Sequence, residues 1–207
     1  MFHRVKTIKL TVFGLYLKMD HSITDQTFEK KDLSGHWLKK GEYDNCIFKQ
    51  CDLSGADLAE IVFIDCTFIT CNLSLARLTK TVLRDITFRD CKMLGLHFED
   101  CNEFGLSFSA EGCILDQSSF YKVKLKKTVF RNTQLKETDL TECDLTEAVF
   151  DNCDLSRAIF DRTILEKADL RTAYNYSIDP EKNKIKKARF SSAGLSGLLE
   201  KYNIRID

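Results

Sequence analysis

The sequence predicts an all-β solenoid, a chain wound into a rod in which every side of every turn is built from five residues. Large apolar residues recur at every fifth position over about 145 residues, which is the signature of a short structural repeat. The residue two places before each large one is predominantly small, so two of every five positions face inward. Neither the 3.6-residue period of a helix nor the two-residue period of an ordinary strand stays in register with this pattern.

Composition agrees with one ordered, elongated body. A single proline and nine glycines among 207 residues, with 43% hydrophobic residues, exclude collagen-like, linker-rich and disordered chains. The length fits one domain or one repeat body with short ends. The sequence therefore divides into residues 1–22, 23–190 and 191–207.

Residues 1–22 are expected to be an N-terminal extension that is poorly ordered or caps the rod. The segment is basic and partly apolar, but Lys9 interrupts its apolar stretch and no signal-peptidase site follows Leu17. It is also far shorter than the roughly 20 residues that a membrane span needs. We expect a cytoplasmic protein that does not enter a membrane, with Met1 or Met19 as its native start.

Residues 23–190 hold the repeat. The pattern breaks at Glu103, is resumed by Phe108, and continues after a shift of two residues, so we expect an irregularity near 103–112 and a loop near 174–187. Ala188, Arg189 and Phe190 fit a last turn. The large residues are Phe28, Leu33, Leu38, Tyr43, Phe48, Leu53, Leu58, Phe63, Phe68, Leu73, Leu78, Leu83, Phe88, Met93 and Phe98, and then Leu115, Phe120, Leu125, Phe130, Leu135, Leu140, Leu145, Phe150, Leu155, Phe160, Leu165 and Leu170.

Segments such as CDLSGADLAE and TDLTECDLTEAVF match the motif Ala-(Asp/Asn)-Leu-x-x, and through them the sequence resembles the pentapeptide-repeat proteins over about residues 23 to 175. The resemblance implies a right-handed, four-sided (quadrilateral) parallel β-helix with about 20 residues per turn, followed here by a short C-terminal α-helix. Seven to eight turns at about 4.8 Å each would make a rod of roughly 35 Å.

The nine cysteines are interpreted as small buried hydrophobic residues, because all of them occupy the small inward position. Stacking at 20-residue intervals would place Cys51, Cys71 and Cys91 in one column of reduced thiols. The alternative, a metal site or a disulfide framework, is not favoured. The cysteines are Cys46, Cys51, Cys66, Cys71, Cys91, Cys101, Cys113, Cys143 and Cys153.

The histidines do not assemble a catalytic site. His3 and His21 belong to the N-terminal segment, His36 takes an inward position and His97 an outward one. No nucleophile–base pair, metal-ligand spacing or glycine-rich phosphate loop accompanies them. We therefore predict that the protein is not an enzyme and has no catalytic residues, no cofactor and no metal site.

Residues 191–207 predict a short amphipathic helix and a strand. Ser191 and Ser192 can provide the N-cap, and Asn203 can end the helix in the left-handed conformation. Two interpretations stay open, a cap folded over the last turn and a dimerisation element. The apolar stripe at i, i+3, i+4 and i+7, together with the alternating terminal segment, comprises Leu195, Leu198, Leu199, Tyr202, Ile204 and Ile206.

The segment GLSGLLEKYNIRI resembles the C-terminal ends of the Qnr and MfpA branch of pentapeptide-repeat proteins, in which a terminal helix and strand join two rods end to end. The resemblance implies a homodimer whose interface is formed by these six apolar residues. Gly194 and Gly197 would allow the helices to approach closely.

Charge gives the weakest indication of a partner. Lys plus Arg and Asp plus Glu number 31 each, so no direct binding to nucleic acid is expected. The same resemblance implies a DNA mimic that binds DNA gyrase or topoisomerase IV and protects against fluoroquinolones. The alternative is a scaffold or immunity-type protein with another protein partner, favoured by the balanced charge and by the lack of long projecting loops.

Acidic residues concentrate in two places. The first choice for partner contact is the group nearest the proposed dimer centre, and a smaller group comprises Glu42, Asp44 and Asp65. Charges that alternate from turn to turn, such as Lys40 with Glu60, predict stabilising ion pairs along the rod, each worth less than about 1 kcal/mol. The first group is Asp139, Glu142, Asp144, Glu147 and Asp154.

Overall fold

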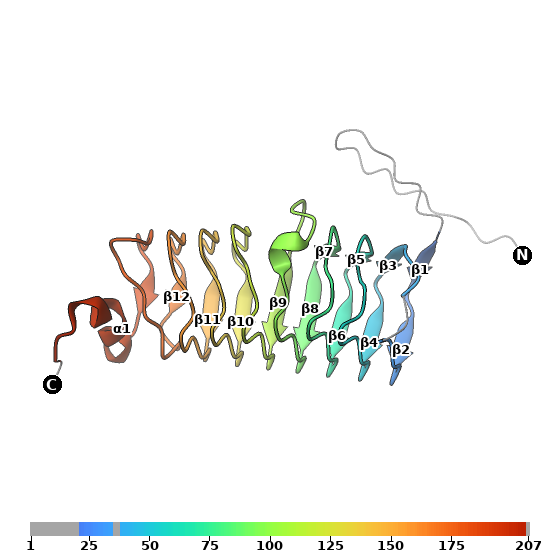
Figure 1. The fold of residues 1–207 in the computed structure, drawn as a ribbon, viewed down its shortest axis with the longest axis horizontal. Helices are drawn as coiled ribbons and strands as arrows, with labels where there is room; N and C mark the ends of the chain where they lie inside the picture. The colour runs from blue at the N-terminus through green and yellow to red at the C-terminus, as the bar shows by residue number, and fades with distance from the viewer. Residues whose placement is uncertain (1–20, 35–37, 206–207) are drawn as a thin grey trace, which may run out of the picture.

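The described residues form a single rod of short parallel strands (Figure 1). The computed structural model describes residues 21–34 and 38–205, so the predictions for residues 1–20 and for His36 fall outside it. One sheet has four strands in the order β1-β3-β5-β7, and the other has nine, from β2 to β13. Nine strands correspond to eight turns between the first and the last, or about 38 Å of rod. The predicted all-β solenoid with a short C-terminal helix is confirmed.

The strands are two to four residues long, because each crosses only one side of the rod. Three 3-10 helices (η1 to η3) and one α-helix complete the described part of the chain. The elements are β1 Ser22–Thr24, β2 Thr27–Glu29, β3 Glu42–Asp44, β4 Ile47–Lys49, β5 Val62–Ile64, β6 Thr67–Ile69, β7 Val82–Arg84, β8 Ile86–Arg89, η1 Phe98–Asp100, β9 Phe108–Glu111, β10 Val129–Arg131, β11 Val149–Asp151, β12 Asp169–Leu170, β13 Arg189–Phe190, η2 Ser192–Gly194, α1 Ser196–Leu199 and η3 Glu200–Tyr202.

Each turn has four sides, which we number in chain order starting from the side that contains β2. Side 1 carries the nine-stranded sheet, and side 4 carries the four-stranded sheet. Sides 2 and 3 are joined from turn to turn by isolated bridges such as Asp52↔Asn72 and Asp57↔Arg77. Equivalent residues in successive turns are 20 apart, as in the pairing of Tyr43 with Phe63. Sides 2 and 4 are therefore opposite sides of the rod.

The core is filled by stacked rings and small side chains. On side 1 the ring of Phe48 lies 4.8 Å from that of Phe28 and 4.7 Å from that of Phe68, measured between centroids. In the small inward position the Cys66 thiol donates to the carbonyl oxygen of Tyr43 at 3.2 Å. The hydroxyl of Thr81 makes the equivalent bond to Leu58 at 2.8 Å. Cys and Thr share this position because either side chain reaches a carbonyl of the preceding turn.

All nine cysteines are free and buried, as predicted. The predicted column exists, since the backbone N–H of Cys51 donates to Cys71 Sγ at 3.4 Å. Burial raises the pKa of the Cys66, Cys101 and Cys153 thiols to about 12. These thiols are therefore protonated at neutral pH.

The placement of Phe108 corrects the predicted repeat. In the pairing of β8 with β9, Ile86 lies beside Phe108 and Phe88 lies beside Ala110. Phe108 therefore fills a small inward position, and Ala110 fills the large one. The two extra residues precede Phe108, in a loop at 102–107, because the pairing of Ala110 with Phe130 already follows the 20-residue register. The exchange keeps one large and one small side chain in the layer, so the core volume is maintained.

The corners of the rod have left-handed backbone conformation. Among the described residues, 25 that are not glycine have positive φ, including Gln50 (52°), Thr70 (53°) and Leu75 (59°). Such residues cost about 1–2 kcal/mol in this conformation. Hydrogen bonds between turns offset the cost: the N–H of Gln50 donates to Ile69 at 2.8 Å and that of Thr70 to Arg89 at 2.8 Å.

The C-terminal segment folds back on the last turn. The Ser191 hydroxyl accepts from the Gly194 N–H at 3.1 Å, which caps η2, while α1 is only four residues long. Asn203 ends η3 in the left-handed conformation, as predicted. Ile204 and Arg205 are not in a strand, and Ile206 lies outside the described residues. A strand there would need a pairing partner that these described residues do not provide.

Candidate functional site

Three features of the described residues bear on function: a cavity, an exposed apolar end of the rod and the charged sides of the rod. Within them, no three or more His, Cys, Asp or Glu side chains are placed to hold a metal ion. His97 is outward, as predicted, and its Nδ1 lies 3.0 Å from Glu99 Oε1. In the same described ranges, no helix has the length and apolar character needed to cross a membrane.

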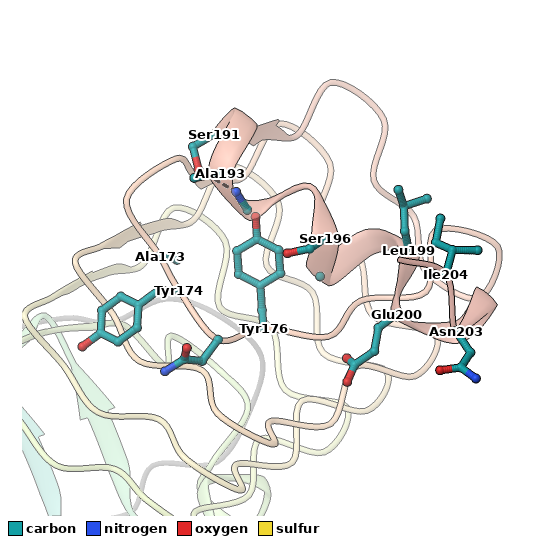
Figure 2. A pocket seen from close by; sticks show the side chains of 13 residues that line it. Ala173, Tyr174, Tyr176, Ser191, Ala193, Ser196, Leu199, Glu200, Asn203 and Ile204 are labelled. Carbon is teal, nitrogen blue, oxygen red and sulfur yellow. Dashed lines mark hydrogen bonds between the residues drawn. The ribbon is translucent and has the colours of Figure 1, made fainter. Parts of the chain in front are cut away.

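A cavity of about 690 Å³ lies between the last turn and the C-terminal segment. Figure 2 shows the Tyr176 ring beneath the turn that carries Ser191 and Ala193. Tyr176 is 5% exposed, and its hydroxyl has no hydrogen-bond partner among the described residues. The cavity is lined mainly by small and polar side chains, with Leu199 and Ile204 at its outer end.

The two glycines of this segment serve contacts within the chain. A Cβ at Gly194 would lie 2.0 Å from the Tyr176 hydroxyl, and one at Gly197 would lie 2.2 Å from the Tyr176 carbonyl oxygen. The Gly197 carbonyl also accepts from the N–H of Ile178 at 2.9 Å. The close approach expected between two helices is thus made to Tyr176 of the same chain.

The six residues predicted for a dimer interface divide into three groups. Leu198 packs against the core of its own chain, and Leu199 lines the cavity. Leu195, Tyr202 and Ile204 are 47%, 53% and 56% exposed. Ile206 lies outside the described residues. The exposed apolar surface at this end of the rod therefore comes from Leu195, Tyr202 and Ile204.

The first predicted acidic group does not form one surface. Asp139 points outward on side 3, and Glu142 occupies the next corner. Asp144 lies on side 4, Glu147 at the corner after it, and Asp154 on side 2. Asp144 and Asp154 are thus on opposite sides of the rod.

Four of these five carboxylates are also ion-paired with side chains of neighbouring turns. Hydrogen bonding to Lys167 lowers the pKa of Glu147. Burial alone would raise the pKa of Asp154, but hydrogen bonds from Ser156 and Asn175 lower it. The pairs are Glu142 with Lys122 (3.7 Å) and Arg162 (2.9 Å), Asp144 with Lys126 (3.2 Å), Glu147 with Lys127 (3.9 Å) and Lys167 (2.9 Å), and Asp154 with Lys136 (3.4 Å).

Unpaired acidic charge is found instead on side 4 of the N-terminal half, which we call the acidic half. None of its carboxylates has a Lys or Arg nitrogen within ion-pair distance among the described residues. Two of them accept hydrogen bonds from neutral side chains: Asn45 donates to Asp25 at 2.6 Å and Ser107 donates to Asp85 at 3.0 Å. The carboxylates of the acidic half are Asp25, Glu42, Asp44, Asp65 and Asp85.

The sequence had indicated only three of these residues. Asp25 and Asp85 are about 40 and 20 residues from Asp65, so they do not stand out as part of one acidic group along the sequence. Tracing the 20-residue column from Asp25 through Asp65 to Asp85 separately would have found them. The alternating ion pairs on the neighbouring corner were predicted correctly, since Lys40 Nζ lies 2.7 Å from Glu60 Oε2.

A loop formed by residues 102–107 interrupts side 4 after β7 and projects from the rod (Figure 1). The Asn102 N–H donates to Thr81 and the Ser107 N–H to Leu83, both at 2.9 Å, so the loop leaves and rejoins the same side. Phe104 in this loop is 80% exposed. It is the most exposed large apolar side chain among the described residues.

Comparison with known proteins places these features in a family. The family model for the pentapeptide repeat region matches residues 42–110 and 107–174. A search of curated proteins found no match. Full-length QnrB1, a plasmid-mediated fluoroquinolone resistance protein, is 18% identical with a TM-score of 0.56, covering 89% of this chain and 100% of its own.

HetL, a pentapeptide-repeat protein involved in heterocyst differentiation regulation from the cyanobacterium Nostoc sp. strain PCC 7120, gives a TM-score of 0.66. Its identity is 17%, and the match covers 84% of this chain and 89% of HetL. A trypsin-treated form of QnrB1 matches at 0.59 with 18% identity, over 90% of this chain and 100% of its own. At these identities the matches establish a common fold.

Proposed function

The chain belongs to the pentapeptide-repeat family, and from this premise we propose that it is a non-enzymatic binding protein whose acidic half engages the DNA-binding surface of a type II topoisomerase. The partner would be DNA gyrase or topoisomerase IV, and binding would protect it from fluoroquinolones. The protein would act in the cytoplasm, where its buried thiols stay reduced.

One observation carries the proposal, namely the run of unpaired carboxylates along the acidic half. A protein surface that binds duplex DNA is complementary to a regular series of negative charges, because DNA carries one charge per about 1.7 Å of its axis. A carboxylate without a cationic neighbour adds an uncompensated negative charge to such a surface, whereas the charge of an ion-paired carboxylate is offset by its partner. For this reason we place the contact on Asp65 and Asp85 rather than on the ion-paired group around Glu142.

A second feature supports a protein partner. Exposed aromatic side chains are typical anchors of protein interfaces, and Phe104 projects beside the C-terminal edge of the acidic half. An aromatic anchor next to a charged surface combines affinity with electrostatic steering.

The end of the rod is proposed as a homodimer contact through Leu195, Tyr202 and Ile204, which are exposed. Truncation after Arg189 would remove all three and is expected to give a monomer. Sedimentation velocity at micromolar concentration checks this, and a full-length chain that already sediments as a monomer would contradict the dimer.

The proposed partner is tested by a gyrase supercoiling assay with and without ciprofloxacin. Wild-type protein is expected to change supercoiling or relieve inhibition, and Asp65→Lys with Asp85→Lys should weaken that effect. Thermal unfolding of the variant checks that the fold is kept, because Asp85 accepts a hydrogen bond from Ser107. A matched control is Lys92→Glu, an outward charge reversal on side 2. Neither rescue nor inhibition at micromolar wild-type protein would refute the proposed partner.

A scaffold with a different protein partner is the second candidate. It is favoured by the equal numbers of acidic and basic residues and by the HetL match, whose TM-score exceeds those of the QnrB1 structures. Co-purification from the native host with a protein other than a topoisomerase, lost on Phe104→Ala, would support this candidate.

A further inference from the structure

Side 4 carries opposite charge in its two halves, and we infer from this that two copies of the chain pack side 4 against side 4 with their rods antiparallel. The acidic half has five carboxylates and one base, Arg84. After the projecting loop, side 4 carries seven lysines and three carboxylates. The lysines are Lys124, Lys126, Lys127, Lys167, Lys184, Lys186 and Lys187.

The repeat defines a register for this contact. The turn that contains Glu42 and Asp44 lies two turns before β7, and the turn that contains Lys124 and Lys126 lies two turns after it. A two-fold axis along β7 therefore places these turns opposite each other. The axis is parallel to the strands, so the facing strands of the two copies run in the same direction. A residue just before the inward side chain in one copy therefore faces the residue just before the inward side chain in the other copy.

Glu42 consequently faces Lys124 of the second copy, and Asp44 faces Lys126. Both members of the first pair are available, since neither Glu42 nor Lys124 has an ion-pair partner among the described residues. Lys126 is already ion-paired within its own chain, since its Nζ lies 3.2 Å from Asp144 Oδ2 in the next turn. The Glu42–Lys124 pair, formed twice across the axis, is therefore the informative one.

The same register places an apolar contact one turn to either side of the axis, while Arg84 of β7 faces Arg84 of the second copy. The loop with Phe104 is one turn after β7, so it lies over β5 of the second copy, one turn before β7. There Val62 and Ile64 point outward and are only partly covered within their own chain. Because the loop is displaced from the axis, the two projecting loops lie side by side rather than meeting. Phe104 is thereby removed from water in both copies.

The contact is small and charged at its edges. Five turns span roughly 24 Å, and one side of the rod is about 10 Å wide. The contact area is therefore below that of a stable interface. Association is therefore expected only at high protein concentration and low ionic strength, because salt screens the flanking pairs. An apolar end-to-end contact at Leu195, Tyr202 and Ile204 would respond little to salt, which separates the two modes.

The test is sedimentation equilibrium of the full chain at low and high salt, with Glu42→Lys, Lys124→Glu and the double variant. Each single variant is expected to lower the salt-sensitive association at least about tenfold, as two like-charge contacts replace two attractive ones. The double variant restores opposite charge at both contacts and should recover most of the association. Lys92→Glu on side 2 is the matched control and should leave it unchanged.

Salt-insensitive behaviour of the wild type, or a double variant no better than the single ones, would overturn the inference. Binding of fluorescent duplex DNA that Lys124→Glu abolishes, without any salt-dependent self-association, would also overturn it and assign the lysines to nucleic acid. The measurements use the purified chain alone, so their outcome is independent of topoisomerase binding.

Discussion

Phe108→Ala tests the corrected packing of the core most directly. The Phe108 side chain is 6% exposed and contacts four other rings, which belong to Phe88, Phe98, Phe120 and Phe130. The four centroid distances run from 5.3 to 6.3 Å. Truncation therefore removes a ring that joins aromatic columns from two sides of the rod.

The expected loss of stability follows from the void. A buried Phe→Ala change costs about 3–5 kcal/mol, and it costs more where neighbours cannot collapse. Here the neighbouring large position is already occupied by Ala110, which is 1% exposed and cannot fill the space. We expect about 4–5 kcal/mol, or a fall in melting temperature of roughly 8–20 °C for a body of this size.

The assay is thermal and denaturant unfolding followed by circular dichroism, with midpoints compared because solenoids can unfold in parts. The control variant Phe108→Ala with Ala110→Phe moves the ring into the large position between Phe88 and Phe130. It should recover all but about 1–1.5 kcal/mol of the loss, as volume-conserving exchanges do. A single variant that loses less than about 1 kcal/mol, or a double variant that recovers nothing, would refute the assigned register.

Three further predictions concern thiols, corners and pH. The nine thiols should not react with Ellman's reagent in the native protein at pH 8, because all nine are buried and burial also raises the pKa of Cys66 to about 12; fast reaction of native protein would contradict this. Leu75→Asn should raise stability by about 1 kcal/mol, read as a higher melting temperature, because Leu75 is 71% exposed at φ 59° and asparagine tolerates that conformation; a lower melting temperature would show that leucine is not strained there. Hydrogen bonding to Arg171 lowers the pKa of Asp169, so its contribution is present above the unfolded pKa of about 4 and is lost as pH falls through the folded value. Asp169→Asn should therefore flatten the acid limb of a plot of melting temperature against pH, and an unchanged acid limb would count against this. Hydrogen bonding to Asp179 raises the pKa of Lys201, so the contribution of Lys201 is present below a pH of about 10.4 and is lost only as pH rises through the folded pKa.

Much of the fold followed from the order of residue types. The inward positions, the 20-residue stacking, the burial of all nine cysteines and the left-handed Asn203 were all predicted. The inward positions and the buried cysteines were accessible because they depend on side-chain size and polarity at a fixed spacing, which repeats many times. The 20-residue stacking was implied by the resemblance to the pentapeptide-repeat proteins, and Asn203 was predicted because asparagine tolerates the left-handed conformation.

The exceptions depended on contacts that no local pattern encodes. Phe108 has the residue type of a large position and continues the five-residue count, so sequence assigns it there. Two strand pairings show otherwise: Phe108 pairs with Ile86, and Ala110 pairs with Phe130. They place the two extra residues in the loop before Phe108. Likewise, positions 194 and 197 hold glycine because a Cβ at either position would clash with Tyr176, which lies about 20 residues earlier.

The candidate site divides in the same way. The sequence by itself determined that the chain is a rod of five-residue repeats, which residues point outward, and that acidic side chains gather in its N-terminal and C-terminal halves. The four sides were implied by the resemblance to the pentapeptide-repeat proteins. Only the tertiary structure decided which of those charges remain unpaired, because ion pairing depends on distances of a few ångströms between residues about 20 apart. Those distances neutralise Glu142 and Glu147 and leave Asp65 and Asp85 without a cation, which moves the proposed contact to the opposite half of the rod.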